Sequence, residues 1–311
     1  MAEAIAFCAM AIEGALGWPA WLHRRVGHPV GAFAALITAC DRRLNLRSAR
    51  ERTRRAGGCL TVCLLLLVAG GGAWLIEQAV RGFAGIWSWP VLGLLAWPAM
   101  AARSLDDHVR PIHRALRQGD LEGAREAVGR IVGRDTTALD QAGVARAAIE
   151  SLAESFCDGV VAPLFWLLVL GLPGAWIYKA LNTADSMIGH REVPYTHFGW
   201  AAARSDDLAN LLPARLSGLL LCLAALGGLA TLWRDHARHA SPNAGWPEAA
   251  MAGALSVRLA GPIAYDGELA DKPWIGQGGE ADAAALARAM KIYRRACALL
   301  GAIVLGAAWL G

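Results

Sequence analysis

Apolar residues in this chain occur in blocks that approach the length needed to cross a bilayer. A membrane-spanning helix needs about 20 predominantly apolar residues. About six segments fit this pattern: residues 2–17, 57–80, 85–102, 160–180, 208–233 and a last helix that ends at residue 310. Between them we find no strand pattern and no repeat of fixed period. The chain is therefore predicted to be an all-α, polytopic membrane helical bundle.

The helical pattern is interrupted at several points. Residues 17–19 (Gly-Trp-Pro) end the first helix, and a tight turn at residues 81–82 is expected to join the second and third segments. Residues 171–174 (Gly-Leu-Pro-Gly) split the fourth segment. Because irregular backbone at membrane depth is tolerated where it lines a polar cavity, we predict a broken or re-entrant helix there.

Residues 103–158 have an amphipathic pattern instead of the apolar length of a span. Apolar residues recur at helical spacing on both sides of Gly119-Asp120, which supplies a helix stop and an N-cap. Thr137 and Asp140 then have the spacing of a capping box for a further helix. We therefore predict one membrane-embedded domain, residues 1–311, in which residues 103–158 form a cytoplasmic helical insertion.

Composition supports a membrane protein and narrows its partners. The chain is 56% hydrophobic, and its formal net charge of +4 comes mostly from arginines beside the apolar blocks. Arginines in this position are typical of the charges that orient a membrane protein. The chain has no basic face interleaved with aromatic residues, which is the pattern expected for nucleic-acid binding. We expect the lipid bilayer as a partner and no nucleic acid.

Four charged residues recur at four-residue intervals after residue 140. They are Arg146, Glu150, Glu154 and Asp158, which would form a stripe that drifts slowly around one helix. The carboxylates could hold Mg²⁺, which prefers one or two carboxylates together with water and phosphate. The alternative is a solvated helix face paired with Arg146. Spacing alone leaves both open.

A second polar group directly follows an apolar run. Lys179, Asn182, Asp185 and Ser186 are separated by steps of three and four, so one helix face would carry all four side chains. Such groups are costly to bury, which favours a functional role. Residues 189–191 (Gly-His-Arg) follow and suit an anion, although a basic anchor after a span has the same pattern.

Weaker signals come from three further places. Asp206 and Asp207 could complement a helix dipole, but Asn210 one turn later favours a polar face. The pair His236 and His239 lacks a third ligand nearby, so metal binding is not predicted there. Neither a phosphate-binding Gly-x-x-x-x-Gly-Lys loop nor a dinucleotide-binding Gly-x-Gly-x-x-Gly motif occurs.

Eight motifs along the chain resemble the adenosylcobinamide-phosphate synthase family, membrane proteins of cobalamin biosynthesis. In order, the motifs are His28-Pro29-Val30, Asp135-Thr-Thr-x-Leu-Asp140, Ala148-Ile-Glu-Ser-Leu-Ala-Glu154, Asp158-Gly-Val-Val-Ala-Pro163, Tyr178-Lys-Ala-x-Asn-Thr-x-Asp-Ser-Met-Ile-Gly-His190, Phe198-Gly-Trp-Ala-Ala-Ala-Arg204, Asp206-Asp-x-x-Asn210 and Ser241-Pro-Asn-Ala-Gly-x-Pro-Glu248. Residues 17–19 lack the acidic residue common in the family, so we assign no site residue there.

The resemblance implies an ATP-dependent amide ligation. A propionate carboxylate of adenosylcobyric acid would be joined to aminopropanol phosphate, or to a related amine, with Mg²⁺ and with ATP as co-substrate. Catalytic roles are assigned to Lys179, Asp185, His190 and Glu150, and metal-binding roles to Asp158, Asp185 and Glu154. Substrate-binding roles are assigned to His28, Asp135, Asp140, Asn182, Ser186, Arg191, Asp206, Asp207, Asn210, Arg215, Asn243 and Glu248.

The same resemblance implies a multi-pass protein of the cytoplasmic (inner) membrane. Its expected partners are the corrinoid, the amino-alcohol phosphate and other cobalamin-assembly membrane proteins. With the arginine-rich residues 24–55 inside, six plain spans would place residues 183–205 outside, away from ATP. We therefore expect residues 160–180 and 208–233 each to turn back, the latter near residues 227–228. The competing function is a transporter or sensor for an anionic small molecule.

Overall fold

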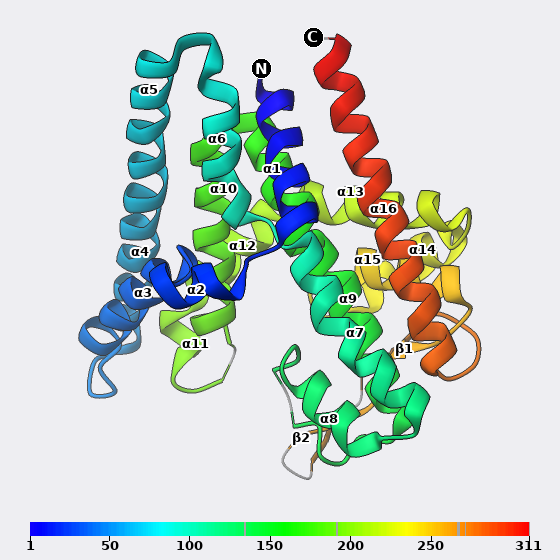
Figure 1. The fold of residues 1–311 in the computed structure, drawn as a ribbon. Helices are drawn as coiled ribbons and strands as arrows, with labels where there is room; N and C mark the ends of the chain where they lie inside the picture. Colours follow the sequence, from blue (N-terminus) through cyan, green and yellow to red (C-terminus); the bar gives the residue numbers. More distant parts are fainter. Residues whose placement is uncertain (134, 191, 266–267, 271, 311) are drawn as a thin grey trace. The chain divides into compact units, whose positions relative to one another are not determined.

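The computed structural model describes residues 1–133, 135–190, 192–265, 268–270 and 272–310, and it forms two compact units (Figure 1). Unit 1 comprises Met1–Ala101, Ala162–Asn210 and Val304–Gly311, and unit 2 comprises Ala102–Val161 and Leu211–Ile303. The predicted insertion, residues 103–158, falls within unit 2. Whether it lies in the cytoplasm stays a prediction.

Unit 1 is built from helices that pack on a core including Ile37, Leu65, Tyr178 and Phe198. In chain order its helices are α1 (Ala2–Leu16), α2 (Ala20–Val26), α3 (Val30–Leu44), α4 (Glu51–Leu66), the π-helix η1 (Leu67–Gly71), α5 (Gly72–Ala84), η2 (Gly85–Trp87), α6 (Ser88–Ala96), η3 (Trp97–Ala99), α10 (Ala162–Ile188), α11 (Tyr195–Phe198) and α12 (Trp200–Ala209). The axes of α1 and α2 differ by 108°, which confirms the break predicted at residues 17–19.

Unit 2 has its own core, which includes Ile149, Phe156, Met251 and Tyr293. Its helices are α7 (Ala102–Gln118), α8 (Leu121–Gly129), α9 (Gln141–Phe156), the π-helix η4 (Cys157–Val161), α13 (Leu211–Ala225), α14 (Leu229–Asp235), η5 (His236–Arg238), α15 (Gly245–Leu255) and most of α16 (Ala283–Leu310). Helices α13 and α14 both pack on α15, and α9 packs on α7, α8 and α15.

Unit 2 also contains strands, which the sequence did not predict. In the described part of the chain, β1 (Leu259–Ala260) pairs with β4 (Trp274–Ile275) and β2 (Ile263–Tyr265) with β3 (Glu268–Ala270), both antiparallel. Strands of two or three residues are too short to show a period-two alternation in the sequence. They leave the predicted fold class unchanged, an all-α polytopic membrane bundle.

Several stretches of the described chain are long and apolar enough to cross a membrane. They are Glu51–Gln118, Gln141–Ile188 and Ala283–Leu310, and two bent helix pairs raise the possible number of spans from three to five. The bent pairs are Ala2–Leu16 with Ala20–Val26 and Trp200–Ala209 with Leu211–Ala225. The turn between the second and third predicted segments is at Gly85, where φ is +52°, and not at residues 81–82, because α5 continues to Ala84.

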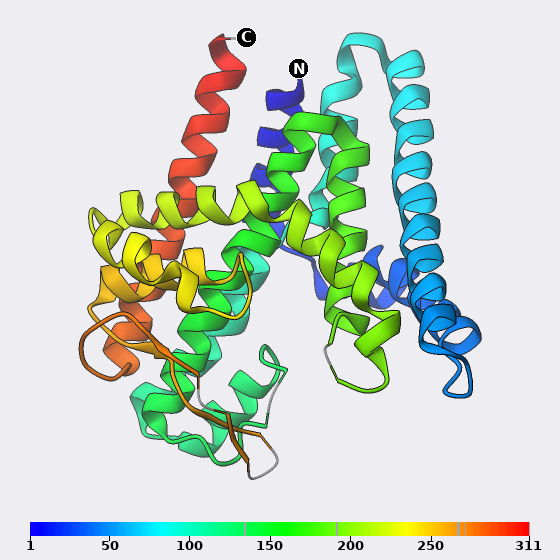
Figure 2. The ribbon, with the colours of Figure 1, turned by 180° about the vertical axis from the view of Figure 1, so that it is seen from behind.

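Helix α10 reverses direction at Gly171, as Figure 2 shows in green. The φ of Gly171 is +69°, in the left-handed region that favours glycine. A Cβ added to Gly174 would lie 2.2 Å from the carbonyl oxygen of Trp166, although residues eight apart in a straight helix are separated by about 12 Å. The predicted broken helix is therefore confirmed, and its two halves form a hairpin.

A carboxylate on a neighbouring helix stabilises this reversal. Glu77 of α5 is 7% exposed, and its Oε2 accepts a hydrogen bond of 3.0 Å from the backbone N–H of Leu172. Its Oε1 pairs with Arg81 at 2.6 Å. The first N–H groups of a helix lack partners within the helix and favour a negative charge. Glu77 thus satisfies the backbone where the second half of α10 begins.

Other predicted helix ends are confirmed or corrected. Gly119 has a φ of +73°, and Asp120 caps α8 by accepting from the N–H of Gly123. Positive φ at Leu226 and Gly228 confirms the turn near residues 227–228. The capping box was wrong at its first position, since Asp140 itself is the N-cap of α9.

Candidate functional site

The predicted polar face lies on the second half of α10 in unit 1. Lys179, Asn182 and Asp185 are half-buried, and Ser186 is exposed. The hydroxyl of Ser186 donates to the carbonyl oxygen of Asn182 at 2.9 Å. Because this part of α10 is a regular helix, the four side chains share one face, as the spacing predicted.

A hydrogen-bond network joins side chains of α10 to side chains at the C-terminal end of α12. The hydroxyl of Tyr178 donates to Oδ1 of Asn210 at 3.1 Å, and Nδ2 of Asn210 donates to Oδ2 of Asp206 at 3.0 Å. Nδ2 of Asn182 lies 3.5 Å from Oδ1 of Asp206. Tyr178, Asn210 and Asp206 are 1%, 2% and 8% exposed. The network joins α10 to α12 and to Asn210, the residue that follows α12.

His28 lies between α2 and α3, and the positive charge of Lys179 affects its pKa. Its Nδ1 accepts from the N–H of Val30 at 3.2 Å, and its ring contacts that of Trp18 edge-on at 4.6 Å. Burial, together with the positive charge of Lys179, lowers the pKa of His28 to about 4. His28 is therefore neutral at pH 7, and it belongs to the electrostatic surroundings of Lys179.

The chain after α10 places the remaining unit 1 candidates. A Cβ on Gly189 would lie 2.6 Å from the backbone carbonyl oxygen of Asp185 and 2.0 Å from its Oδ1, so the chain passes close to this residue. His190 is exposed, and its ring centroid is 6.2 Å from that of Tyr195. Asp207 pairs with Arg204 at 3.3 Å. Arg191 lies outside the described residues.

In unit 2, the acidic stripe begins on α9 and is partly used by the protein itself. Oε1 of Glu150 accepts a 2.7 Å hydrogen bond from the N–H of Ala260 and lies 4.0 Å from Nε of Arg146. The guanidinium of Arg146 lies over the ring of Trp274, 5.0 Å from its centroid. Asp158 is in the π-helix η4, after the end of α9.

A polar cavity of about 280 Å³ opens in unit 2 beside α9 and α15. It is lined by Ile131, Val132, Gly133, Ala147, Glu150, Ser151, Glu154, His239, Glu248, Ala260 and Lys272. The structure thus brings together three predicted site residues, Glu150, Glu154 and Glu248, which come from two helices. Glu150 is half-buried and Glu154 is exposed, and the functional interpretation of the acidic stripe stays a prediction.

The loop before α15 shapes one wall of this cavity. Nδ1 of His239 accepts from the N–H of Ser241 at 3.0 Å, and its Nε2 lies 3.7 Å from Oε1 of Glu248, which is 4% exposed. Burial lowers the pKa of His239 below its ordinary value. Nδ1 is the acceptor, so the neutral ring carries its proton on Nε2, facing Glu248.

Arg215 and Asn243, also predicted as substrate-binding residues, meet at the same loop. An Nη of Arg215 lies 3.4 Å from Oδ1 of Asn243, and its guanidinium lies over the ring of Trp246 at 4.8 Å. The ring of His236 also contacts the ring of Trp246, and the two ring centroids are 4.1 Å apart. His236 and His239 therefore have separate partners.

The two remaining candidates have local backbone roles. Oδ1 of Asp135 accepts from the N–H and the hydroxyl of Thr137, at 2.9 and 2.8 Å, and these hydrogen bonds lower the pKa of Asp135. Asp140 caps α9 through the N–H of Gly143 at 2.7 Å. Both place α9, and their assignment to substrate stays a prediction.

The residues of the metal-binding prediction come from both units, and the prediction stays untested. Asp158 and Glu154 belong to unit 2, and Asp185 belongs to unit 1. Among the residues that the structure describes, no group of three or more His, Cys, Asp or Glu side chains is arranged to hold a metal ion. A site for Mg²⁺ would need fewer protein ligands, because this ion keeps waters and substrate phosphates in its shell.

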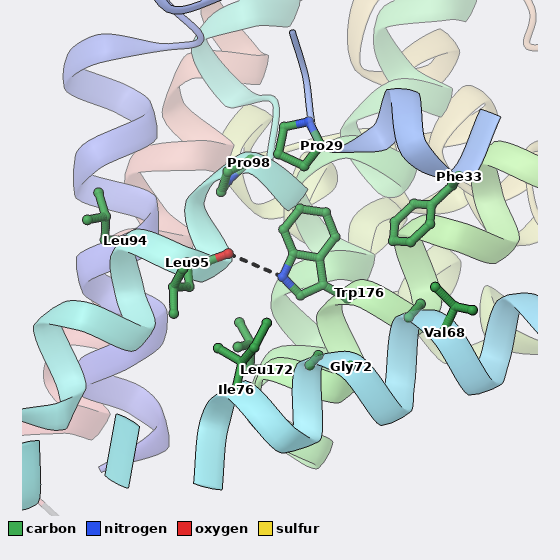
Figure 3. Close-up of a pocket in the computed structure, with 12 residues that line it drawn as sticks. Pro29, Phe33, Val68, Gly72, Ile76, Leu94, Leu95, Pro98, Leu172 and Trp176 are labelled. Atoms are coloured by element: carbon green, nitrogen blue, oxygen red, sulfur yellow. Dashed lines mark hydrogen bonds between the residues drawn. The ribbon is translucent and has the colours of Figure 1, made fainter. Parts of the chain in front are cut away.

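Unit 1 contains a second cavity, of about 330 Å³, with different chemistry (Figure 3). Phe33, Ile76, Leu172 and Trp176 are among its lining residues, and the indole N–H of Trp176 donates to the carbonyl oxygen of Leu95 at 3.2 Å. None of the described residues that line it is charged. Its described lining is thus almost entirely apolar, unlike that of the cavity in unit 2.

Comparison with known proteins decides the family. The family model described as CobD/Cbib protein matches residues 6–293. The chain belongs to the CobD/Cbib family. It is 51% identical over 300 residues to the Cobalamin biosynthesis protein CobD of Rhodobacter capsulatus, covering 93% of this chain and 92% of that protein. This confirms the resemblance found in the motifs.

Two further relatives carry the same description. The Cobalamin biosynthesis protein CobD of a Sinorhizobium species is 47% identical over 313 residues, covering 96% of each chain. That of Geobacter metallireducens is 45% identical over 288 residues, covering 88% of this chain and 86% of the other. No solved structure matches the chain.

Sequence reasoning missed some polar residues of this CobD/Cbib family member. Glu77 was read as part of a plain span, although a lone carboxylate within an apolar segment could have marked it as functional. His239 was weighed only as a metal ligand. Lys272 follows a loop without a motif, and no local signal joins it to α9.

Proposed function

We propose that the protein catalyses an ATP-dependent amide ligation in cobalamin biosynthesis. Aminopropanol phosphate, or a related amine, is joined to the propionate carboxylate of adenosylcobyric acid to give adenosylcobinamide phosphate. The observation that carries the proposal is the match of residues 6–293 to a family whose relatives are cobalamin biosynthesis proteins. The charged residues that such a ligation requires are present in both units.

The chemistry explains why these charges are needed. A carboxylate resists attack by an amine until it has a leaving group. In the proposed reaction, a carboxylate oxygen attacks the γ-phosphorus of ATP, giving an acyl phosphate and ADP. The amine nitrogen then attacks the acyl carbon, phosphate departs with the bonding electrons, and the nitrogen loses a proton. Negative charge builds up on phosphate oxygens, so fixed cations stabilise the transition state.

We assign the phosphate contacts to unit 1. Lys179 and His190 contact the transferring phosphate, and Arg191 is a further candidate. Lys179 is half-buried on a rigid helix that the Tyr178–Asn210–Asp206 network joins to α12. A preorganised cation of this kind does not have to reorient as charge develops.

The proposed metal contacts are Asp158 and Asp185, with Glu154 or Glu150 supporting the shell. Mg²⁺ would supply neutralisation of the ATP phosphates when bound. A pair of carboxylates with phosphate and water fits the preference of this ion.

A deletion strain tests the proposal in cells. Loss of the gene should cause cobyric acid to accumulate and abolish cobinamide phosphate, as measured by mass spectrometry of the corrinoids. Added cobinamide should restore cobalamin, whereas added cobyric acid should not. Unchanged corrinoid pools would contradict the proposal and would favour a transporter or sensor.

A further inference from the structure

The polar cavity of unit 2 has the size of a small ligand. Its volume of about 280 Å³ falls just below the range of about 300–1,000 Å³ that is usual for drug-sized molecules. A corrinoid is far too large to enter. The walls come from α9, from α15 and from the residues around Ala260 and Lys272, all within unit 2.

The described residues that line this cavity carry more negative than positive charge. Glu150, Glu154 and Glu248 contribute three carboxylates, and Lys272 contributes one ammonium. His239 adds no positive charge at pH 7, because burial lowers its pKa. A small ligand with a cationic group matches this lining, and an additional anionic group would match Lys272.

The carboxylates differ in how firmly the protein holds them. Glu150 already accepts the Ala260 N–H and lies beside Arg146. Glu248 is in the first turn of α15, is 4% exposed and faces Nε2 of His239 at 3.7 Å. The ring of His239 is itself oriented by the Ser241 N–H. A carboxylate in this setting is a preorganised counter-ion.

We propose that this cavity binds the amine substrate, with Glu248 as the counter-ion of its ammonium group and His239 as the positioning residue of Glu248. The inference rests on the proposed function, since a ligase that uses an amino-alcohol phosphate must bind an ammonium and a phosphate together. Lys272 lies on the cavity wall to receive the phosphate end.

The test compares two ligands on two proteins. The ligands are aminopropanol phosphate and the same molecule with a hydroxyl in place of the amine. Calorimetry measures their binding to the full-length protein in detergent micelles at pH 7. Glu248→Gln keeps the side-chain size but removes the charge, so it should weaken the amine by about ten- to hundredfold and leave the hydroxyl analogue unchanged.

Glu280→Gln is the matched control. Glu280 has a side chain 63% exposed and pairs with Arg258 at 2.8 Å, so its loss should leave both affinities unchanged. Equal weakening of both ligands by Glu248→Gln, or no weakening of either, would overturn the proposal. Failure of the wild-type protein to bind the amine in preference to the analogue would overturn it as well.

A second variant carries the test if Glu248→Gln does not fold. His239→Gln should raise the KM for the amine by about three- to tenfold and leave kcat at saturating amine unchanged. A lowered kcat with an unchanged KM would overturn the positioning role. If the wild type binds the amine by charge but forms no amide with ATP and corrinoid, the proposed function fails while the binding site stands.

Discussion

In unit 1 the amide and carboxylate side chains between α10 and α12 bond to one another, whereas in unit 2 the carboxylates of α9 and α15 surround a cavity. Asn210 and Asp206 are buried and their polar atoms are used within the protein. Glu248 is equally buried, but it faces a space of about 280 Å³. The polar side chains of the two regions are therefore similarly buried. In unit 1 they contact one another, whereas in unit 2 Glu248 borders a cavity.

From this difference we expect the network residues to position the site and the cavity residues to contact ligands. Variants of the Tyr178–Asn210–Asp206 network are expected to change the free energy of unfolding. Variants of the cavity residues are expected to change the affinity for ligand. Lys179 and Asp185 lie on the same helix as Tyr178 but are half-buried, so they are expected to contact ligands despite their place in unit 1.

The largest effect should come from the proposed catalytic contacts. Lys179→Ala, Asp185→Asn and Asp158→Asn should each lower the rate of amide formation by about 10² to 10³. Lys179 is proposed to contact the phosphate, and the two aspartates to hold the Mg²⁺ that neutralises it. Single-turnover assays on folded, membrane-extracted protein measure this rate. Glu122→Gln is the control, since the Glu122 side chain is 91% exposed. Near-normal rates in all three site variants would refute the assignment.

Removing the carboxylate that caps the reversed helix should affect stability instead. Glu77→Ala leaves the N–H of Leu172 and the guanidinium of Arg81 without this partner, so it should lower the free energy of unfolding by about 2–3 kcal/mol. Thermal unfolding in detergent measures the loss. Glu77→Gln retains an acceptor oxygen and should cost less. Equal losses in the two variants would show that the hydrogen bond to Leu172 is unimportant.

A variant of the network in unit 1 should have a smaller effect on stability, and it tests directly whether this network is separate from substrate binding. Tyr178→Phe removes the donor to Asn210 and should cost about 1–2 kcal/mol of stability. The KM for each substrate should stay unchanged, because the hydroxyl is buried and bonded within the protein. Thermal unfolding and initial-rate kinetics on the same preparation measure both quantities. A raised KM without a loss of stability would move this network into the binding site.

The smallest effect concerns His28 and pH. Its pKa in the folded protein is about 4, below the ordinary 6.5, so only the unfolded chain takes up the proton as the pH falls between these values. The wild type should therefore lose stability from pH 6.5 down to pH 4, relative to His28→Asn, by about 1 kcal/mol after allowance for its partial exposure. Unfolding measured at several pH values tests this. Parallel curves for the two proteins would contradict it.

The sequence could predict the breaks in the helices but not what stabilises them. Gly171 and Pro173 mark the reversal of α10 because both act through local backbone geometry. The cap from Glu77 joins positions 95 residues apart, so no local pattern could reveal it. The turn at Gly85 was misplaced by a few residues for a different reason. The sequence does not show which of Gly82 and Gly85 adopts the positive φ.

The candidate site shows the same limit. The spacing of Glu150 and Glu154 indicated a shared face, and the motif ending at Glu248 indicated function. Only the packing of α9 on α15 places these residues around one cavity with His239 and Lys272. The orientation of His239 depends on the Ser241 N–H, a contact that residue identity does not specify.

The most direct test of the central claim is an amide-formation assay with the purified protein in detergent. Adenosylcobyric acid, aminopropanol phosphate, Mg²⁺ and ATP are supplied together, and each is omitted in turn, with corrinoids followed by mass spectrometry and ADP measured in parallel. The account predicts adenosylcobinamide phosphate in equal amount to ADP, and only in the complete mixture. ADP release without amide, or amide formation without ATP, would contradict it.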